Sequence, residues 1–163
     1  MILADELKLY LSGGISNIDS NLSLGGQMST TEITQNLFNS VINTDITNFY
    51  EDYRCIYFYN SSNTESIINL RVLTAVDDSG DDSDLFLSVA HEGINTIAQA
   101  ISSATAAPLN QTFLPCLNDS TALALGDLGP NEFLGVWFKR TVDANPNLRG
   151  SCTVNFFIKA DTP

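Results

Sequence analysis

Residues 132–142, EFLGVWFKRTV, give the clearest indication of the fold of this chain. Val136, Trp137 and Phe138 are consecutive large apolar residues, so a strand that contains them is apolar on both faces. Such a strand lies in the middle of a sheet that is covered on both sides. We therefore predict a central β-strand here, with Trp137 in the core, as in sandwich folds that bury a central tryptophan.

Six further stretches carry strand patterns and are separated by turns rich in Gly, Asn, Asp and Pro. They are residues 7–11 (LKLYL), 54–59 (RCIYFY), 66–76, 84–90, 121–125 and 151–159. Period-two alternation places one apolar set on the inner face of each of three strands: Ile68, Leu70, Val72 and Thr74; Leu85, Leu87 and Val89; Cys152, Val154, Phe156 and Ile158. Because no βαβ rhythm is present, roughly seven such strands predict an antiparallel β-sandwich, immunoglobulin-like or jelly-roll-like.

One short helix is expected near the N-terminus. Ser29 and Glu32 have capping-box spacing, and one helical face then collects Ile33, Leu37, Phe38, Val41 and Ile42. Glycine pairs before this helix bracket a polar loop, which indicates an N-terminal arm over about residues 1–28. Residues 95–103 favour a long loop that packs Ile97 and Ile101. We expect residues 1–163 to form a single domain.

The composition excludes several classes of partner. Seven basic residues oppose 19 acidic ones, which gives a formal charge of −12, while Asn, Ser and Thr supply 46 of the 163 residues. Such a charge repels nucleic acid and anionic lipid, so neither is expected as a partner. The longest uncharged stretch, residues 94–118, is interrupted by polar residues and fails as a membrane span. Asp5 and Glu6 lie where a secretory signal carries positive charge, so we expect synthesis in a reducing cytoplasm.

The reactive side chains give no catalytic or metal signature. His91 is the only histidine, and without a G-x-S-x-G elbow we predict a strand-end residue with no catalytic duty. Cys55, Cys116 and Cys152 have no C-x-x-C spacing, so we expect free buried thiols; a Cys55–Cys152 bridge is the alternative. We predict no catalytic, cofactor-binding or metal-ligating residue, no cofactor, and no enzyme activity.

Two local features have competing interpretations. Residues 77–84 contain five carboxylates, which favours a solvated hairpin loop; a weak calcium site and docking on a basic partner are the alternatives. An aromatic run follows the proposed helix: Tyr50, Tyr53, Tyr57, Phe58 and Tyr59. Its inward members are predicted to be core, whereas a carbohydrate platform or a subunit interface is the other interpretation.

Several motifs taken together resemble a known family. They are residues 9–12 (LYLS), the glycine pairs, residues 29–33, residues 53–57 (YRCIY), residues 125–132 (LGDLGPNE) and residues 136–142 (VWFKRTV). Their order, over about residues 7–160, resembles small virion structural proteins that tailed bacteriophages, cyanophages among them, encode beside their head genes. The chain departs from that pattern in the acidic stretch at residues 77–84 and at Asn131, where glycine is common.

The resemblance implies a non-enzymatic role, because such families are typically structural. The implied function is capsid decoration: a homotrimer that cements the major capsid protein lattice on the outer surface of the virion head. The alternative is a tail or fibre-associated module that binds host glycan through the tyrosine-rich strand. Charge and position suggest a small set of partner contacts: Leu3, Asp5 and Glu6 in the residue 1–6 arm, with Lys139, Arg140 and Arg149.

Overall fold

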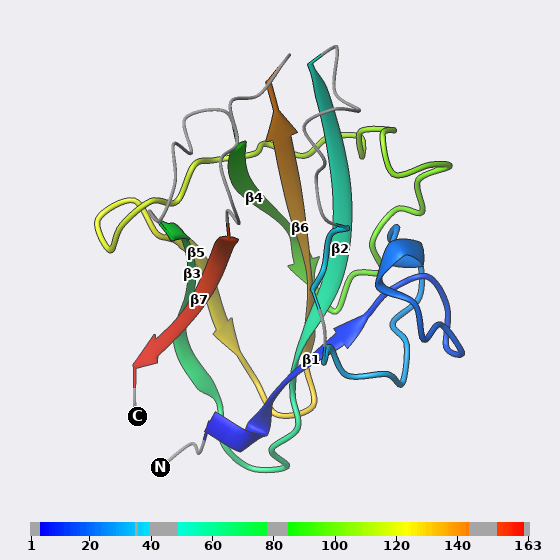
Figure 1. The fold of residues 1–163 in the computed structure, drawn as a ribbon. Coiled ribbons are helices and arrows are strands. Elements are labelled where there is room, and N and C mark those ends of the chain that lie inside the picture. The colour runs from blue at the N-terminus through cyan, green and yellow to red at the C-terminus, as the bar shows by residue number, and fades with distance from the viewer. Residues whose placement is uncertain (1–3, 35, 40–48, 78–84, 144–152, 162–163) are drawn as a thin grey trace.

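The computed structural model describes residues 4–34, 36–39, 49–77, 85–143 and 153–161. In this part of the chain seven strands form two packed antiparallel sheets (Figure 1). The four-stranded sheet has the order β1-β2-β6-β4, and the three-stranded sheet has the order β5-β3-β7. The strands are β1 (Leu7–Leu11), β2 (Tyr50–Asn60), β3 (Ile67–Asp77), β4 (Leu85–Ile94), β5 (Leu123–Leu128), β6 (Phe133–Val142) and β7 (Thr153–Asp161). The predicted sandwich and its strand locations are confirmed.

Strand β6 is central, as its sequence predicted. It pairs with β2 on one side and β4 on the other, and Val136, Trp137 and Phe138 are fully buried. Val136 and Phe138 face the core between the sheets. Trp137 belongs to a second apolar cluster on the opposite face of the four-stranded sheet. The run of apolar residues in β6 therefore reflects a sheet that is covered on both faces.

The core between the sheets corrects one predicted register. Leu70, Val72 and Thr74 are buried as expected, but Ile67 takes the inward position that alternation assigned to Ile68. The pairing of β3 shifts between Ile67 and Leu70, and Asn69 there has a φ of 53°. A bulge adds one residue to a strand, so every side chain before it changes face.

The predicted helix after Ser29 is wrong over the residues that the structure describes. Residues 29–33 instead run extended beside β1, where Ile33 N donates to Leu9 O at 2.9 Å and Leu11 N donates to Thr31 O at 3.0 Å. The Ser29 hydroxyl accepts from Thr31 N at 3.0 Å, a turn bond that replaces the expected helix cap. Leu37 and Phe38 still pack on the core between the sheets; Val41 and Ile42 lie outside the described residues. The helical content near the N-terminus is limited to two 3-10 turns, η1 (Ala4–Glu6) and η2 (Ser20–Leu22).

The segment expected to form an arm is largely part of the body. Residues 7–11 are strand β1, and Ser12 and Ser23 are buried. Their hydroxyls donate to the carbonyl of Cys55 at 2.7 Å and 2.5 Å, so residues 12–23 are fixed to the four-stranded sheet. Among the residues described, none of the helices is long and apolar enough to cross a membrane.

Candidate interaction surfaces

Two loops cover the face of the four-stranded sheet that points away from the three-stranded sheet (Figure 1). We call residues 12–30 and 95–113 together the loop layer. An apolar cluster joins this layer to the sheet: Tyr53, Cys55, Tyr57, Ala90 and Trp137 of the strands with Ala98 of the second loop. Tyr10, Met28, Ile101, Phe113 and Phe133 pack against it. The loops are apolar on their inner side, which is why they stay on the sheet.

Polar bonds in the loop layer fix the two loops to each other and to the sheet. The Tyr57 hydroxyl donates to Gly26 O at 2.5 Å and accepts from Ala98 N at 2.8 Å. Gly26 N also donates to Ala98 O at 2.9 Å. Beneath the loops, Trp137 Nε1 of β6 donates to Glu92 Oε1 of β4 at 2.9 Å, a bond within the sheet. Burial raises the pKa of Tyr57 to about 12. The loop layer is therefore a fixed surface whose buried polar groups have partners.

The outer side of the loop layer exposes aliphatic side chains. More than half of the surface of each is accessible: Ile15, Ile18 and Leu22 on the first loop, Ile97 and Leu109 on the second. Ile18 is the most exposed of them, at 82%. Ile101 packs on the sheet as predicted, whereas the prediction that Ile97 also packs is wrong. Apolar side chains that lie together on a protein surface are typical of contact surfaces.

The tyrosine-rich strand does not form an open aromatic platform. Tyr53, Tyr57 and Phe58 are buried, which confirms their interpretation as core. The Tyr53 hydroxyl donates to Glu51 at 2.8 Å, and burial followed by this bond raises its pKa to about 12. Tyr50 and Tyr59 are half-buried. Three of the five rings are therefore inside the protein and unavailable for stacking on a sugar.

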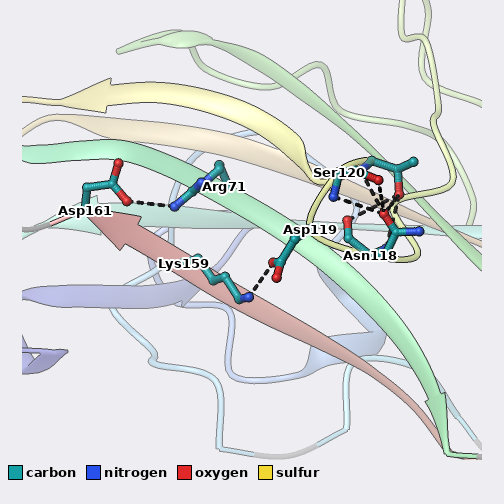
Figure 2. A network of polar contacts seen from close by, with 7 residues as sticks. Arg71, Asn118, Asp119, Ser120, Lys159 and Asp161 are labelled. Carbon is teal, nitrogen blue, oxygen red and sulfur yellow. Dashed lines mark hydrogen bonds and ion pairs between the residues drawn. The ribbon is translucent and has the colours of Figure 1, made fainter.

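The outer face of the three-stranded sheet carries a different kind of surface (Figure 2). Arg71 of β3 lies directly opposite Lys159 of β7, an arrangement in which like charges repel. Each cation has its own carboxylate: Arg71 binds Asp161 at 2.8 Å, and Lys159 binds Asp119. The bond from Lys159 lowers the pKa of Asp119. This face is thus charged but locally balanced.

An exposed aromatic ring lies two residues from this network. Phe157 is on the same face of β7 as Lys159 and Asp161 and is 48% exposed. The loop that carries Asp119 is shaped by Asn118, whose Oδ1 accepts from Ser120 N at 3.0 Å and Thr121 N at 3.1 Å. Sequence reasoning did not identify this face as a site. The alternation in β7 was the available signal, because Phe157 and Lys159 alternate with the residues that it placed inward, Phe156 and Ile158.

The predicted contact residues on β6 make ion pairs within the chain. Arg140 binds Asp52 through Nε at 2.8 Å and through a second nitrogen at 2.6 Å, and only 11% of its side chain is exposed. Lys139 binds Glu51 at 3.1 Å. Burial alone would raise the pKa of Glu51, but hydrogen bonds from Tyr53 and Lys139 lower it. These ion pairs link β6 to β2, so the charged groups of Lys139 and Arg140 are largely occupied within the chain.

The other predicted contacts and alternatives are distributed over the chain. Asp5 is exposed in η1, and Glu6 is half-buried, with its carbonyl accepting from Ser61 N at 2.8 Å. Leu3, Arg149 and the acidic residues 78–84 lie outside the described residues.

The reactive side chains in the described part are dispersed. Cys55 and Cys116 are free and buried as predicted, and burial raises the pKa of both thiols. Cys152 lies outside the described residues. The alternative of a Cys55–Cys152 bridge is wrong, because Cys55 is free. His91 is exposed, with Nδ1 2.7 Å from the Glu92 carbonyl. Across the described residues, no cluster of three or more His, Cys, Asp or Glu side chains could hold a metal ion.

A polar hollow lies between the 3-10 turn η2 and the segment that runs beside β1. Its volume is about 900 Å³, and amide, hydroxyl and carboxylate side chains line most of it: Asp19, Ser20, Asn21, Thr31, Glu32, Thr34, Asn36 and Asn39. Phe38 forms an aromatic wall, with the guanidinium carbon of Arg140 4.8 Å from its ring centre. The hollow is therefore lined mainly by hydrogen-bonding side chains, with one aromatic ring at its wall.

No family model, curated protein or solved structure matches this chain. The resemblance to phage virion proteins therefore stays a prediction from sequence motifs. The surfaces described above carry the functional argument.

Proposed function

We propose that this chain is a non-enzymatic structural protein of a tailed-phage virion, a capsid decoration protein that binds the major capsid protein lattice on the outside of the head. The observation that carries the proposal is the loop layer. It presents aliphatic side chains, Ile18 foremost, on a frame that buried hydrogen bonds hold in place.

A fixed apolar surface suits binding to a protein lattice. The frame is ordered before binding, so little conformational entropy is lost when a partner docks. The exposed residues of the first loop, Ile15, Ile18 and Leu22, are uncharged, so contact there does not require the desolvation of a charge. The chain as a whole carries a charge of −12, which supports a protein partner over nucleic acid.

Co-sedimentation with expanded phage heads that lack this protein tests the proposal. The unmodified chain should bind at regular lattice positions, which electron cryomicroscopy of the decorated heads would show as repeated density. The Ile18→Asp, Leu22→Asp double variant should bind about tenfold more weakly or worse, since burying a new charge is costly. Phe86→Asp is the matched control, because Phe86 is also exposed but lies on β4, outside the loop layer. Density only in the tail, or full binding by the double variant, would contradict the proposal.

A second candidate function is binding of a host glycan, for which the polar hollow is the specific support. Asn21 and Asn36 line it and offer amides that suit sugar hydroxyls. A glycan array decides this alternative: selective binding that Asn36→Ala removes supports it, whereas an array with no selective signal counts against it.

A further inference from the structure

The edge strands of the two sheets differ in how far other segments of the chain cover them. The outer edge of β1 is covered by residues 29–33, which donate and accept backbone hydrogen bonds along it. The outer edge of β4 is capped at Val89, whose N–H and C=O both bond to Leu114 at 3.0 Å and 2.9 Å. Proteins commonly cover such edges, because unpaired backbone groups bind other strands.

Strands β5 and β7 form the two edges of the three-stranded sheet, and β5 is the more irregular of the two. Its pairing with β3 shifts twice, and Gly126 within it has a φ of 89°. By contrast, β7 pairs with β3 without interruption from Lys159 to Thr153. No described segment pairs with the other edge of β7. Of the two edges of the three-stranded sheet, β7 is thus the more regular one.

We propose that β7 pairs with β7 of a second copy of this chain, antiparallel and about a two-fold axis, to join the two three-stranded sheets into one continuous sheet. The direction of the strands favours this arrangement over a ring. Since β5 and β7 are both antiparallel to β3, a ring about an axis along the strands would pair β7 with the irregular β5 of the next copy in parallel. Antiparallel pairing of two regular edges is the more stable choice.

A two-fold axis at Phe157 gives a register in which apolar side chains of one copy lie opposite apolar side chains of the other. The two Phe157 rings lie opposite each other on the outer face, where each is now 48% exposed. On the inner face, the half-buried Phe156 of one copy lies opposite Ile158 of the other. Lys159 lies opposite Asn155, so no charges of the same sign oppose each other directly. Apolar cross-strand pairs of this kind stabilise antiparallel sheets.

The charge of the surface is the reason for choosing a second copy as the partner. A chain with a net charge of −12 repels itself over most of its surface. The face of β7 is an exception, because Arg71 and Lys159 balance Asp161 and Asp119. Among the described basic side chains, Lys159 is the most exposed, at 46%. Two copies can therefore meet here without the repulsion that applies elsewhere. This inference does not depend on the capsid proposal.

Sedimentation equilibrium of the full chain over a range of concentrations tests the pairing. The expected species is a dimer, of twice 17.7 kDa. Phe157→Lys places two like charges at the axis and should weaken the dimer about tenfold or more. Phe86→Lys, which changes a residue of equal exposure on β4, should leave the dimer constant unchanged. A trimer, or a monomer at every concentration, would overturn the inference.

Oxidative cross-linking tests the register independently of dimer strength. In a Cys152→Ser background, the remaining described thiols, Cys55 and Cys116, are buried. Phe157→Cys should then form an interchain disulfide under mild oxidation, because side chains directly opposite in an antiparallel pair have Cβ atoms about 5 Å apart. Phe86→Cys should not. A circular dichroism spectrum that matches that of the parent chain would show that each variant is folded. A dimer that survives Phe157→Lys and does not cross-link at that position contradicts the β7 pairing.

Discussion

The two sheets differ in what covers their outer faces. On the four-stranded sheet, the loop layer buries Trp137 and Tyr57. The polar atoms of both rings form hydrogen bonds within the protein. On the three-stranded sheet, Phe157 and an ion-pair network face solvent. The comparison indicates that the first sheet is covered within the monomer, so a partner there meets only the outside of the loop layer, whereas the strands of the second sheet are themselves exposed to a partner. Matched substitutions on the two faces test this distinction.

The largest difference is expected for aromatic truncation. Trp137→Ala removes a fully buried ring and leaves Glu92 without the indole donor, so the free energy of unfolding should fall by about 3–5 kcal/mol. Phe157→Ala removes a half-exposed ring and should change the monomer by less than about 0.5 kcal/mol. Urea denaturation at low protein concentration measures both. Equal losses would show that the face of β7 is also part of the monomer core.

Carboxylate removal should give the next largest contrast. Asp52 is 6% exposed and binds Arg140 through two bonds, with Arg54 nearby. Asp52→Ala leaves buried positive charge uncompensated, which should cost about 3 kcal/mol or more.

The matched change on the other sheet is Asp161→Ala. It breaks an arginine–carboxylate pair of similar length, 2.8 Å, but Asp161 is half-exposed and should contribute only about 0–1 kcal/mol. Thermal unfolding of both variants at two salt concentrations checks the contrast. A strongly destabilised Asp161→Ala chain would contradict it.

Two glycines with positive φ allow a third comparison. A Cβ at Gly25 would overlap the backbone carbonyl of Gln99 and approach Trp137, so Gly25→Ala should push the two loops apart and cost about 3 kcal/mol. A Cβ at Gly126 meets nothing within 4 Å. Gly126→Ala should therefore cost only the strain of its φ, about 1–2 kcal/mol. Hydrogen exchange of the loop amides should increase for the first variant and stay unchanged for the second.

Sequence periodicity predicted the strands well because each strand buries a continuous face. The run at Val136–Trp137–Phe138 predicted a central strand between two apolar layers, and burial of all three residues confirms it. The alternation failed at Ile68, since a bulge at Asn69 changes the face of the residues before it. Local sequence does not reveal such a bulge until the partner strand is known.

The segment from Ser29 and the candidate contacts were harder to predict for a different reason. Ser29 and Glu32 have the spacing of a helix cap, but the open edge of β1 offered residues 29–33 more backbone bonds than an isolated short helix has. Likewise, Lys139 and Arg140 look like free cations in sequence. Their carboxylate partners, Glu51 and Asp52, lie on a strand far away in the chain, so only the pairing of β2 with β6 brings them together.

The smallest effect expected is the response of each face to pH. Burial raises the pKa of Tyr57 from its ordinary value of 10.0 to about 12, so the folded state disfavours the phenolate. The stability that Tyr57 contributes is complete below pH 10 and is lost as the pH rises toward 12. Asp119, whose pKa is lowered by Lys159, acts in the opposite direction, because its contribution is lost as the pH falls through its folded pKa. The side chain of Asp119 is well exposed, so the acid effect should be slight.

Urea midpoints measured from pH 8 to pH 11 should therefore fall more steeply for the parent chain than for Tyr57→Phe. Asp119→Asn should alter the midpoint only at acid pH. If Tyr57→Phe leaves the alkaline slope unchanged, the Tyr57 hydroxyl is not buried in solution, and the loop layer does not cover the sheet as described.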